Sequence, residues 1–414
     1  MTVNEAKLKE LAGVVTNLSA EDSDTRRWAV YDLESYPPEL TVEHLVAGIQ
    51  DEHRAVREAA AEVLESVPTP LGLPLLTSLL GSSRIEVRNI VAALIAKFGD
   101  AAVDYLLEAL AHENEDVRKF SADILGLAES DRAVDSLVTA LYDPVENVGV
   151  SAAEALGKIK SPRALPHLIK AFEKRDYLMR ECAEALGLVG QAEGAHFLKD
   201  HLLDTQDLLI QFAIVDALGN AGDAAIFDFL EVNFEAFPDK LHVPAVMSML
   251  KIASRINIRL LARPGTPLDT LIMAAREADE QFLQLFIEQI DEELPAEVLA
   301  RLIHAHGQLN SRVLVALIKA GRPHAELRQF TLEMVEHSDD WVAYTAIEQL
   351  VDFEPAAARA VLKQVLAGDR NLPQLAAMKV VNRLGLPEGK DWIAPFLESE
   401  DDDLRAMAEQ VLEG

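Results

Sequence analysis

Small and aliphatic residues recur along this chain with a period of about 31 residues. The strings EVRNIVAALIAKF (86–98), DVRKFSADILGLA (116–128) and NVGVSAAEALGKI (147–159) share an aliphatic residue, often an Arg after it, small residues and a later Leu. The residues at the Arg position, called register residues below, are Arg26, Arg57, Arg88, Arg118, Gly149, Met179 and Gln211, then Arg312, Ala343, Gln374 and Arg405. Neighbouring register residues within each run are 30 to 32 positions apart, which indicates internal repeats.

Each period predicts two amphipathic helices. In residues 116–143, apolar residues follow three-and-four spacing through Leu125, and the spacing resumes after the turn ESDRA. Acidic residues cluster before the first helix of several periods, where they cap free N–H groups and oppose the helix dipole. Because one helix pair cannot bury its apolar faces alone, neighbouring pairs must stack. The sequence therefore predicts an all-α, right-handed α-solenoid of about a dozen helix pairs.

The rhythm of the repeats divides the chain into four predicted parts. Residues 1–20 are expected to form an N-terminal capping helix, 21–235 regular repeats, 236–307 degenerate repeats, and 308–414 further repeats with a C-terminal cap. Pro264, Gly265 and Pro267 interrupt the degenerate part and forbid a continuous helix there. Two interpretations stay open for this interruption: a hinge or docking loop, or a long turn between helices.

The repeated strings resemble HEAT-like repeats, particularly the short type named after phycobilisome lyases. The D-x-x-V-R-x-x-A-A-x-x-L-G pattern and second-helix strings such as SPRALPHLIKAF (161–172) carry the resemblance. It implies that the Arg-bearing helix lines a concave side and that the Arg pairs with an Asp of a neighbouring repeat. Gly149, Met179, Gln211 and Ala343 depart from that pattern, so a continuous Asp–Arg ladder is not expected.

The charge balance narrows the class of partner. Acidic residues number 69 against 38 basic ones, which gives a formal net charge of −31. Such a surface repels phosphate backbones, so we expect no nucleic-acid binding. The single Cys182 cannot form an intrachain disulfide, the first residues lack a signal-peptide core, and no stretch is apolar enough for membrane insertion. These features predict a cytoplasmic protein.

No catalytic or metal-binding motif stands out. The chain has one His-Glu dipeptide, His112-Glu113, whereas the HEAT-like deoxyhypusine hydroxylases build their iron site from several. The acidic charge argues against a resemblance to HEAT-like alkylpurine glycosylases, which need a basic groove. Nucleophile-elbow, phosphate-loop and H-E-x-x-H patterns are absent. We therefore expect no enzyme activity, no cofactor and no metal.

The predicted function is a protein-interaction scaffold or adaptor that uses the concave face of an acidic solenoid. Positions one, two, five and nine residues after a register residue should face solvent on the first helices. They give the candidate partner-binding residues Trp28, Tyr31, Glu58, Glu62, Asn89, Phe120, Asp123, Glu154 and Lys158. The partner should be a protein with a basic or mixed surface. The repeat type leaves a bilin lyase-like or chaperone-like role on a partner subunit as the alternative, and the oligomeric state stays open.

The phase of the repeats leaves the aromatic candidates with two possible positions. If Trp28, Tyr31 and Phe120 face the groove, they are natural anchors for a partner. A phase error of one position would instead bury the same rings between repeats.

Overall fold

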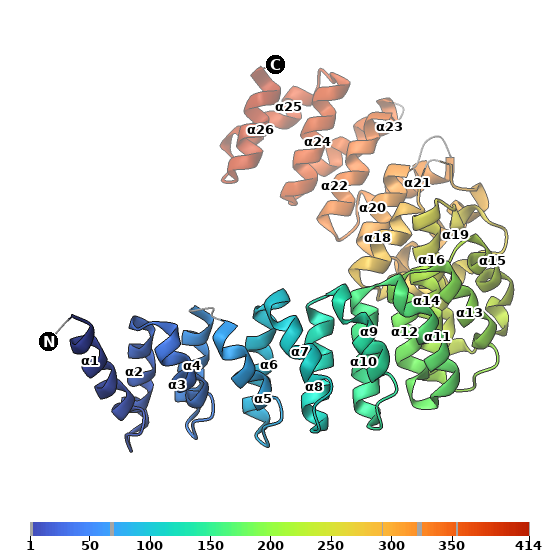
Figure 1. The fold of residues 1–414 in the computed structure, drawn as a ribbon. Helices are drawn as coiled ribbons and strands as arrows, with labels where there is room; N and C mark the ends of the chain where they lie inside the picture. The colour runs from blue at the N-terminus through green and yellow to red at the C-terminus, as the bar shows by residue number, and fades with distance from the viewer. Residues whose placement is uncertain (1–2, 67–69, 292, 321–324, 353–354, 414) are drawn as a thin grey trace. The chain divides into compact units, whose positions relative to one another are not determined.

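A computed structural model describes residues 3–66, 70–291, 293–320, 325–352 and 355–413 of the chain. These residues form α-helices and short 3-10 turns, with no β-strand among them (Figure 1). They group into two compact units, residues 1–222 and 223–414, called unit 1 and unit 2. The predicted α-solenoid of stacked helix pairs is confirmed.

Unit 1 begins with α1 and then alternates a first helix, which carries the register residue, with a second helix. The first helices are α2 (Ser23–Asp32), α4 (Arg54–Ser66), α6 (Ile85–Lys97), α8 (Glu115–Leu127), α10 (Glu146–Ile159), α12 (Met179–Val189) and α14 (Leu208–Ala221). The others are α1 (Val3–Asn17), α3 (Pro38–Gly48), α5 (Leu73–Leu79), α7 (Val103–Ala109), α9 (Val134–Ala140), α11 (Leu165–Lys174) and α13 (Ala192–Leu202). Each first helix packs beside the next, so the unit has two helix layers (Figure 1).

Unit 2 continues the same alternation. Its first helices are α16 (Asp239–Ile256), α18 (Glu280–Glu288), α20 (Ser311–Ala320), α22 (Asp340–Gln349), α24 (Asn371–Leu384) and α26 (Asp402–Glu413). The second layer contains α15 (Ala224–Asn233), α17 (Leu268–Arg276), α19 (Ala296–His304), α21 (Ala325–Met334), α23 (Pro355–Leu366) and α25 (Gly389–Ile393). Helix pairs therefore run through the stretch 236–307 that the sequence marks as degenerate.

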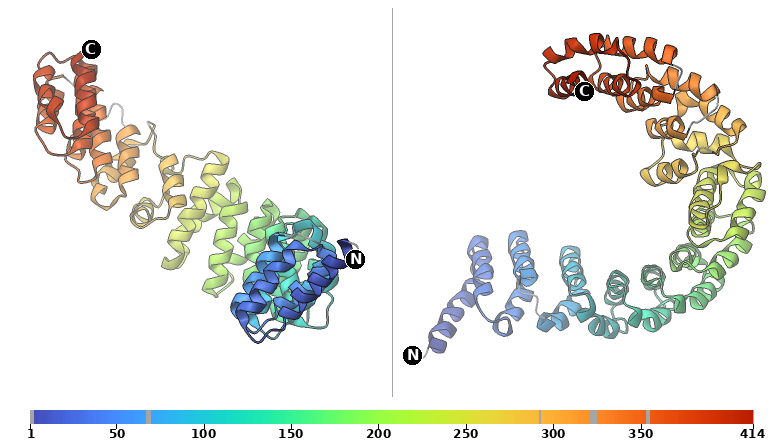
Figure 2. Two further views of the ribbon diagram at one scale, coloured as in Figure 1. Left: turned by 90° about the vertical axis from the view of Figure 1, so that its left-hand side faces the viewer. Right: turned by 90° about the horizontal axis from the view of Figure 1, so that it is seen from above.

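Small residues decide how closely the first helices of unit 1 approach. A Cβ added at Gly126, Gly157 or Gly187 would lie 2.7, 2.9 or 2.6 Å from the Cα of Ala155, Ala185 or Ala217 on the next first helix. Real Cβ atoms do not come so close, so glycine is required at these contacts. The second helices pack less on one another, which places the first-helix layer on the inside of the bend seen in the green part of unit 1 (Figure 2, right).

The register residues join a first helix to the turn that precedes it. Seven of them donate a side-chain hydrogen bond of 2.5–3.0 Å to the carbonyl oxygen six residues earlier: Arg26, Arg57, Arg88, Arg118, Gln211, Gln374 and Arg405. Gln replaces Arg in this role because its amide N–H also donates to a carbonyl. The arginines lie between repeats rather than on the surface: Arg26 and Arg57 are each 7% exposed.

Bidentate Asp–Arg pairs form at two places in unit 1. Arg26 donates to both carboxylate oxygens of Asp51 (2.8 and 2.9 Å), and Arg118 does the same to Asp143 (2.7 and 2.9 Å). Each Asp lies in the turn that leads to the next first helix and also accepts a backbone N–H there. The pairs thus connect neighbouring repeats without extending into a continuous ladder, as the sequence predicts.

The Pro/Gly interruption is anchored at both ends of its loop. Leu260 and Leu261 are buried in a 3-10 turn (Leu260–Ala262), and the Leu260 N–H donates to the Gln289 side chain at 2.8 Å. Arg259 forms ion pairs with Asp291 and Glu293, while Arg263 pairs with Asp228 and Glu231. Ala262, Pro264 and Gly265 are exposed, whereas both ends of the loop are held by these contacts.

Candidate partner-binding surface

The structure places the sequence-predicted candidates on the first-helix layer of unit 1. Trp28, Glu58, Glu62, Asn89 and Glu154 are exposed. The remaining candidates, Tyr31, Phe120, Asp123 and Lys158, are half-buried. None is in the core. The predicted exposure of positions one, five and nine after the register residue holds in unit 1, but position two is buried on α4, α10, α12 and α14, where the helices pack closely and the residues are Ala59, Ser151, Glu181 and Ala213.

The three aromatic candidates differ in their surroundings. Trp28 is 61% exposed, and its ring lies 5.9 Å from that of Tyr31 and 5.5 Å from the Arg27 guanidinium. Tyr31 donates from its hydroxyl to Glu62 on α4 at 2.7 Å, and this hydrogen bond is the main reason why the pKa of Tyr31 is raised. Phe120 is partly covered by the cations of Arg88 and Lys119. Trp28 is therefore the ring best placed to contact a partner.

Carboxylates follow the same helical position along four consecutive first helices. Asp123 lies on α8, Glu154 on α10, Glu184 on α12 and Asp216 on α14, each five residues after its register residue. We call these four residues the carboxylate row. Glu154, Glu184 and Asp216 are exposed, and Asp123 is half-buried beside Lys119, whose Nζ lies 2.8 Å away. The row gives the inner layer of unit 1 a negative strip.

Glu181 is an acidic residue that the candidate residues predicted from the sequence do not include. It lies three residues before Glu184 on α12 and is 4% exposed. One carboxylate oxygen, Oε1, pairs with Arg180, whereas the buried Oε2 has no hydrogen-bond partner. Burial is the largest cause of the raised pKa of Glu184, and the charges of Glu181, Glu154 and Asp216 add to it. Five carboxylates therefore share this strip, and Glu184 extends the predicted set at the same repeat position.

Unit 2 has an apolar groove on its own first-helix layer. The groove encloses about 640 Å³ between α18, α20 and α22, with Ile287, Ile290 and Val315 among its apolar lining. Trp341, 65% exposed, forms one wall with Tyr344, the two rings being 5.6 Å apart. The Tyr344 hydroxyl accepts a hydrogen bond from Lys379 at 2.7 Å. An exposed Trp three residues before a Tyr thus occurs in each unit, at different phases of the repeat.

Comparison with known proteins agrees with this architecture. A family model described as HEAT repeats matches residues 11–96, 103–181 and 134–219, all within unit 1. This is a HEAT-like repeat protein. No curated protein has a matching sequence.

Two solved structures of HEAT-like solenoids resemble the fold. A crystal structure of importin beta in an ammonium sulfate condition has a TM-score of 0.51 and 12% identity, and the match covers 97% of this chain and 74% of that one. A structure of Kap95p binding to RanGDP has a TM-score of 0.51 and 14% identity, and the match covers 100% of this chain and 62% of that one. The chain thus spans less than two thirds of Kap95p, and at such low identity the likeness concerns the fold alone.

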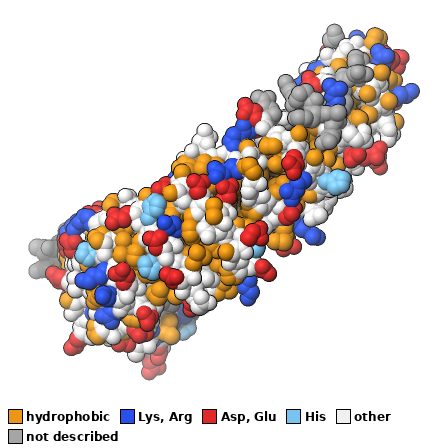
Figure 3. Space-filling model, turned by 90° about the vertical axis from the view of Figure 1, so that its right-hand side faces the viewer, with side chains coloured by type: hydrophobic (Ala, Val, Ile, Leu, Met, Phe, Trp, Pro, Cys, Tyr) orange, Lys and Arg blue, Asp and Glu red, His pale blue; other side chains and the backbone are white. Residues whose placement is uncertain are grey.

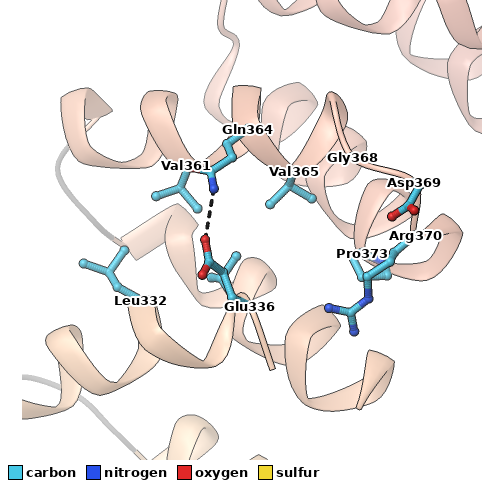
Figure 4. A pocket seen from close by; sticks show the side chains of 10 residues that line it. Leu332, Glu336, Val361, Gln364, Val365, Gly368, Asp369, Arg370 and Pro373 are labelled. Atoms are coloured by element: carbon cyan, nitrogen blue, oxygen red, sulfur yellow. Dashed lines mark hydrogen bonds between the residues drawn. The ribbon is translucent and has the colours of Figure 1, made fainter. Parts of the chain in front are cut away.

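The second-helix layer of this HEAT-like protein offers a smaller pocket in unit 2. It has a volume of about 230 Å³ and lies between α21 and α23, where Gln364 donates to Glu336 at 2.9 Å across the opening (Figure 4). Val361 and Val365 line it beside Asp369 and Arg370 (Figure 4). A valine-lined pocket with a satisfied Gln–Glu pair contains no pairing of a nucleophile with a base.

Cys182 and two histidines that could serve chemistry are held by packing or by hydrogen bonds within the chain. Cys182 is fully buried, and burial raises the pKa of its thiol to about 12, which suppresses the reactive thiolate. His201 packs on Phe172 and Phe197, and His306 bonds the Ile303 carbonyl. Among the described residues, no three His, Cys, Asp or Glu side chains could hold a metal ion.

One face of the molecule has a surface of mixed character. On the face drawn in Figure 3, acidic and basic side chains are interspersed with hydrophobic ones. No helix in the described parts of the chain has the length and apolar content to cross a membrane.

Proposed function

We propose that this HEAT-like protein is a scaffold that binds a partner protein on the first-helix layer of unit 1. The observation that carries the proposal is Trp28, which is 61% exposed on the same layer as Glu58, Glu62 and the carboxylate row. Aromatic anchors dominate the binding energy of protein interfaces, and flanking charges set partner choice and association rate. Such a surface suits a protein with basic residues beside apolar ones. Kap95p, a structural neighbour, binds the protein RanGDP, which supports protein binding as a use of this fold.

A site-specific photo-crosslinking experiment tests the proposal. A photoreactive phenylalanine analogue replaces Trp28 in one variant and Leu75 in another, because Leu75 is an exposed apolar residue on the second-layer helix α5. In host lysate we expect a discrete crosslinked protein at position 28, weakened by salt, and none at position 75. Crosslinks confined to position 75 would reject the first-helix layer as the binding surface.

Truncation of Trp28 to alanine distinguishes a ring that binds the partner from a ring that stabilises the fold. Once the crosslinked partner is purified, Trp28→Ala should weaken its binding by about 1–2 kcal/mol or more. The free energy of unfolding should fall by about 1 kcal/mol at most, since large losses come from core residues. A loss of about 3–5 kcal/mol in stability with unchanged affinity would show that Trp28 has a packing role instead.

A further inference from the structure

The carboxylate row is more ordered than a general acidic surface. Its four members, Asp123, Glu154, Glu184 and Asp216, occupy one position of the repeat on four adjacent first helices. Neighbouring helices that pack through small residues lie about 8–10 Å apart. The glycine contacts of α8, α10 and α12 with the next helix require such close approach. The row therefore repeats negative charge at an interval of about 8–10 Å.

Buried Glu181 supplies a second observation, independent of the row. Its Oε2 is buried and has no hydrogen-bond partner, although its Oε1 is held by Arg180. A buried carboxylate oxygen without a partner is unfavourable by several times the net value of an ordinary hydrogen bond. Residues three apart on a helix are neighbours, so Glu181 lies directly beside Glu184 of the row. Apolar packing alone gives no reason to place a glutamate at this position.

The row already contacts basic side chains of its own chain. Lys119 reaches Asp123 at 2.8 Å, and Arg180 reaches Glu184 at 3.5 Å as well as Glu181. A single metal ion cannot serve the row, because metal ligands converge within about 2–3 Å of one centre. The chemistry that matches is a series of separate ammonium or guanidinium groups.

The spacing of the row selects the conformation of its occupant. A polyproline II segment has three residues per turn and rises about 3.1 Å per residue, so every third side chain returns to one face after about 9.3 Å. A β-strand alternates its faces, so its third residue points away from the row. Only the polyproline II geometry of these two extended forms presents side chains at the row's interval.

We propose that the carboxylate row, with Glu181 beside it, binds an extended partner segment that carries Arg or Lys at every third residue. This inference rests on the proposed function, of which it specifies the partner class. The guanidinium of an arginine has donors enough to contact Oε2 of Glu181 and the carboxylate of Glu184 together. Because Oε2 of Glu181 is buried, this contact requires the Glu181 side chain to turn outward.

Synthetic peptides test the spacing on the full-length protein. The first fluorescent probe repeats Arg-Pro-Ala, the second has the same composition with contiguous arginines, and the third replaces each Arg by neutral citrulline. By fluorescence anisotropy we expect the first probe to bind at least about tenfold more tightly than the second, and the third not to bind. Equal binding of the first two probes would show that the row attracts positive charge whatever its spacing, and would overturn the proposal. Tighter binding of a helical peptide with arginines at every seventh residue would overturn the extended conformation.

A charge-neutral variant tests the role of Glu181. Glu181→Gln should weaken the Arg-Pro-Ala probe by about tenfold while the melting temperature stays the same or rises, because a buried charge is removed. Glu173→Gln, at an exposed position on second-layer helix α11, is the matched control and should leave both unchanged. A lower melting temperature with unchanged probe affinity would show that Glu181 is structural and overturn its assignment. Crosslinking at Trp28 is independent of these probes, so failure here leaves the scaffold proposal separately testable.

Discussion

Neighbouring first helices contact each other differently in the N-terminal repeats and in the later repeats of unit 1. Eight residues after the register residue, the first three repeats have Glu34, in the 3-10 turn after α2, Glu65 on α4 and Ala96 on α6, whereas the first helices α8, α10, α12 and α14 all carry glycine. Glu34 accepts a hydrogen bond from Ser66 on the next first helix at 2.7 Å, and Glu65 pairs with Lys97. In the N-terminal repeats polar side chains therefore bridge neighbouring helices, while in the later repeats the backbones meet directly.

This difference has a consequence for the surface. Where the helices meet through glycine, the first-helix layer is drawn together and the unit bends, while the blue-to-teal repeats run in a straighter row (Figure 2, right). All four members of the carboxylate row lie on the helices that meet through glycine, α8, α10, α12 and α14. The same glycines that tighten the packing thus bring the carboxylates within range of one another.

The register residues divide in a similar way, except that α8 carries both an arginine, Arg118, and a contact glycine, Gly126. Arg occupies the position in α2, α4, α6 and α8, whereas α10, α12 and α14 have Gly149, Met179 and Gln211. At Gly149 the Tyr177 hydroxyl lies 3.2 Å from the place of an added Cβ, so a tyrosine fills that space. Arginine anchors are thus concentrated where glycine contacts are missing.

The largest expected effect comes from removing an arginine anchor. Arg118→Ala leaves the carboxylate of Asp143 without its partner, and the two side chains are only 12% and 9% exposed. We expect the free energy of unfolding to fall by about 3–5 kcal/mol, measured by denaturant titration followed by circular dichroism. Arg405→Ala is the matched control: Arg405 occupies the same repeat position but pairs with exposed Asp402, and should lose about 1 kcal/mol. Equal losses would mean that burial of the pair contributes nothing.

The glycine contacts should be the next most sensitive feature. Gly187→Ala places a Cβ 2.6 Å from the Ala217 Cα, a backbone atom that cannot rotate away. Forcing apart α12 and α14 should destabilise the protein by about 1–3 kcal/mol in the same titration. Gly13→Ala in α1 has open space at its Cβ and should instead stabilise by up to about 1 kcal/mol. Similar effects of the two changes would contradict the close-contact explanation.

The comparison also shows how far the sequence could predict the surface. Trp28, Phe120 and Glu181 occupy the same repeat position, two residues after the register residue. The first is 61% exposed, the second half-buried and the third 4% exposed. Repeat phase predicts the helix pairs, which depend on local periodicity, but it leaves Trp28 with two possible positions, in the groove or between repeats. The burial of Glu181 depends on how closely neighbouring helices approach, which periodicity does not encode.

Acid should weaken the arginine-anchored region first. Burial alone would raise the pKa of Asp143, but the hydrogen bonds from Arg118 and the Val145 N–H outweigh it, and the net pKa is lowered; Asp51 behaves likewise with Arg26. A lowered folded-state pKa contributes stability above the unfolded value of about 3.9 and loses it as the pH falls through the folded value. Denaturant midpoints measured from pH 7 to pH 2 should therefore decline below about pH 4. Asp143→Asn should flatten part of this decline, and an unchanged pH profile would contradict it.

The smallest expected effect lies in the carboxylate row and has the opposite sign. The pKa of Glu184 is raised, chiefly by burial and further by Glu181, Glu154 and Asp216, although Arg180 opposes the shift. A raised carboxyl pKa favours the folded state below the unfolded value and loses that contribution as pH rises, so ionised Glu184 disfavours folding at pH 7. Glu184→Gln should therefore stabilise slightly at pH 7, within about 0.5 kcal/mol because the side chain is half exposed, and the gain should vanish below about pH 4. Glu173→Gln, exposed on α11, should show no such pH-dependent gain. A loss of stability in Glu184→Gln at pH 7 would mean that Arg180 outweighs the neighbouring acids, and the tightly packed repeats would then carry no electrostatic strain for a cationic partner to relieve.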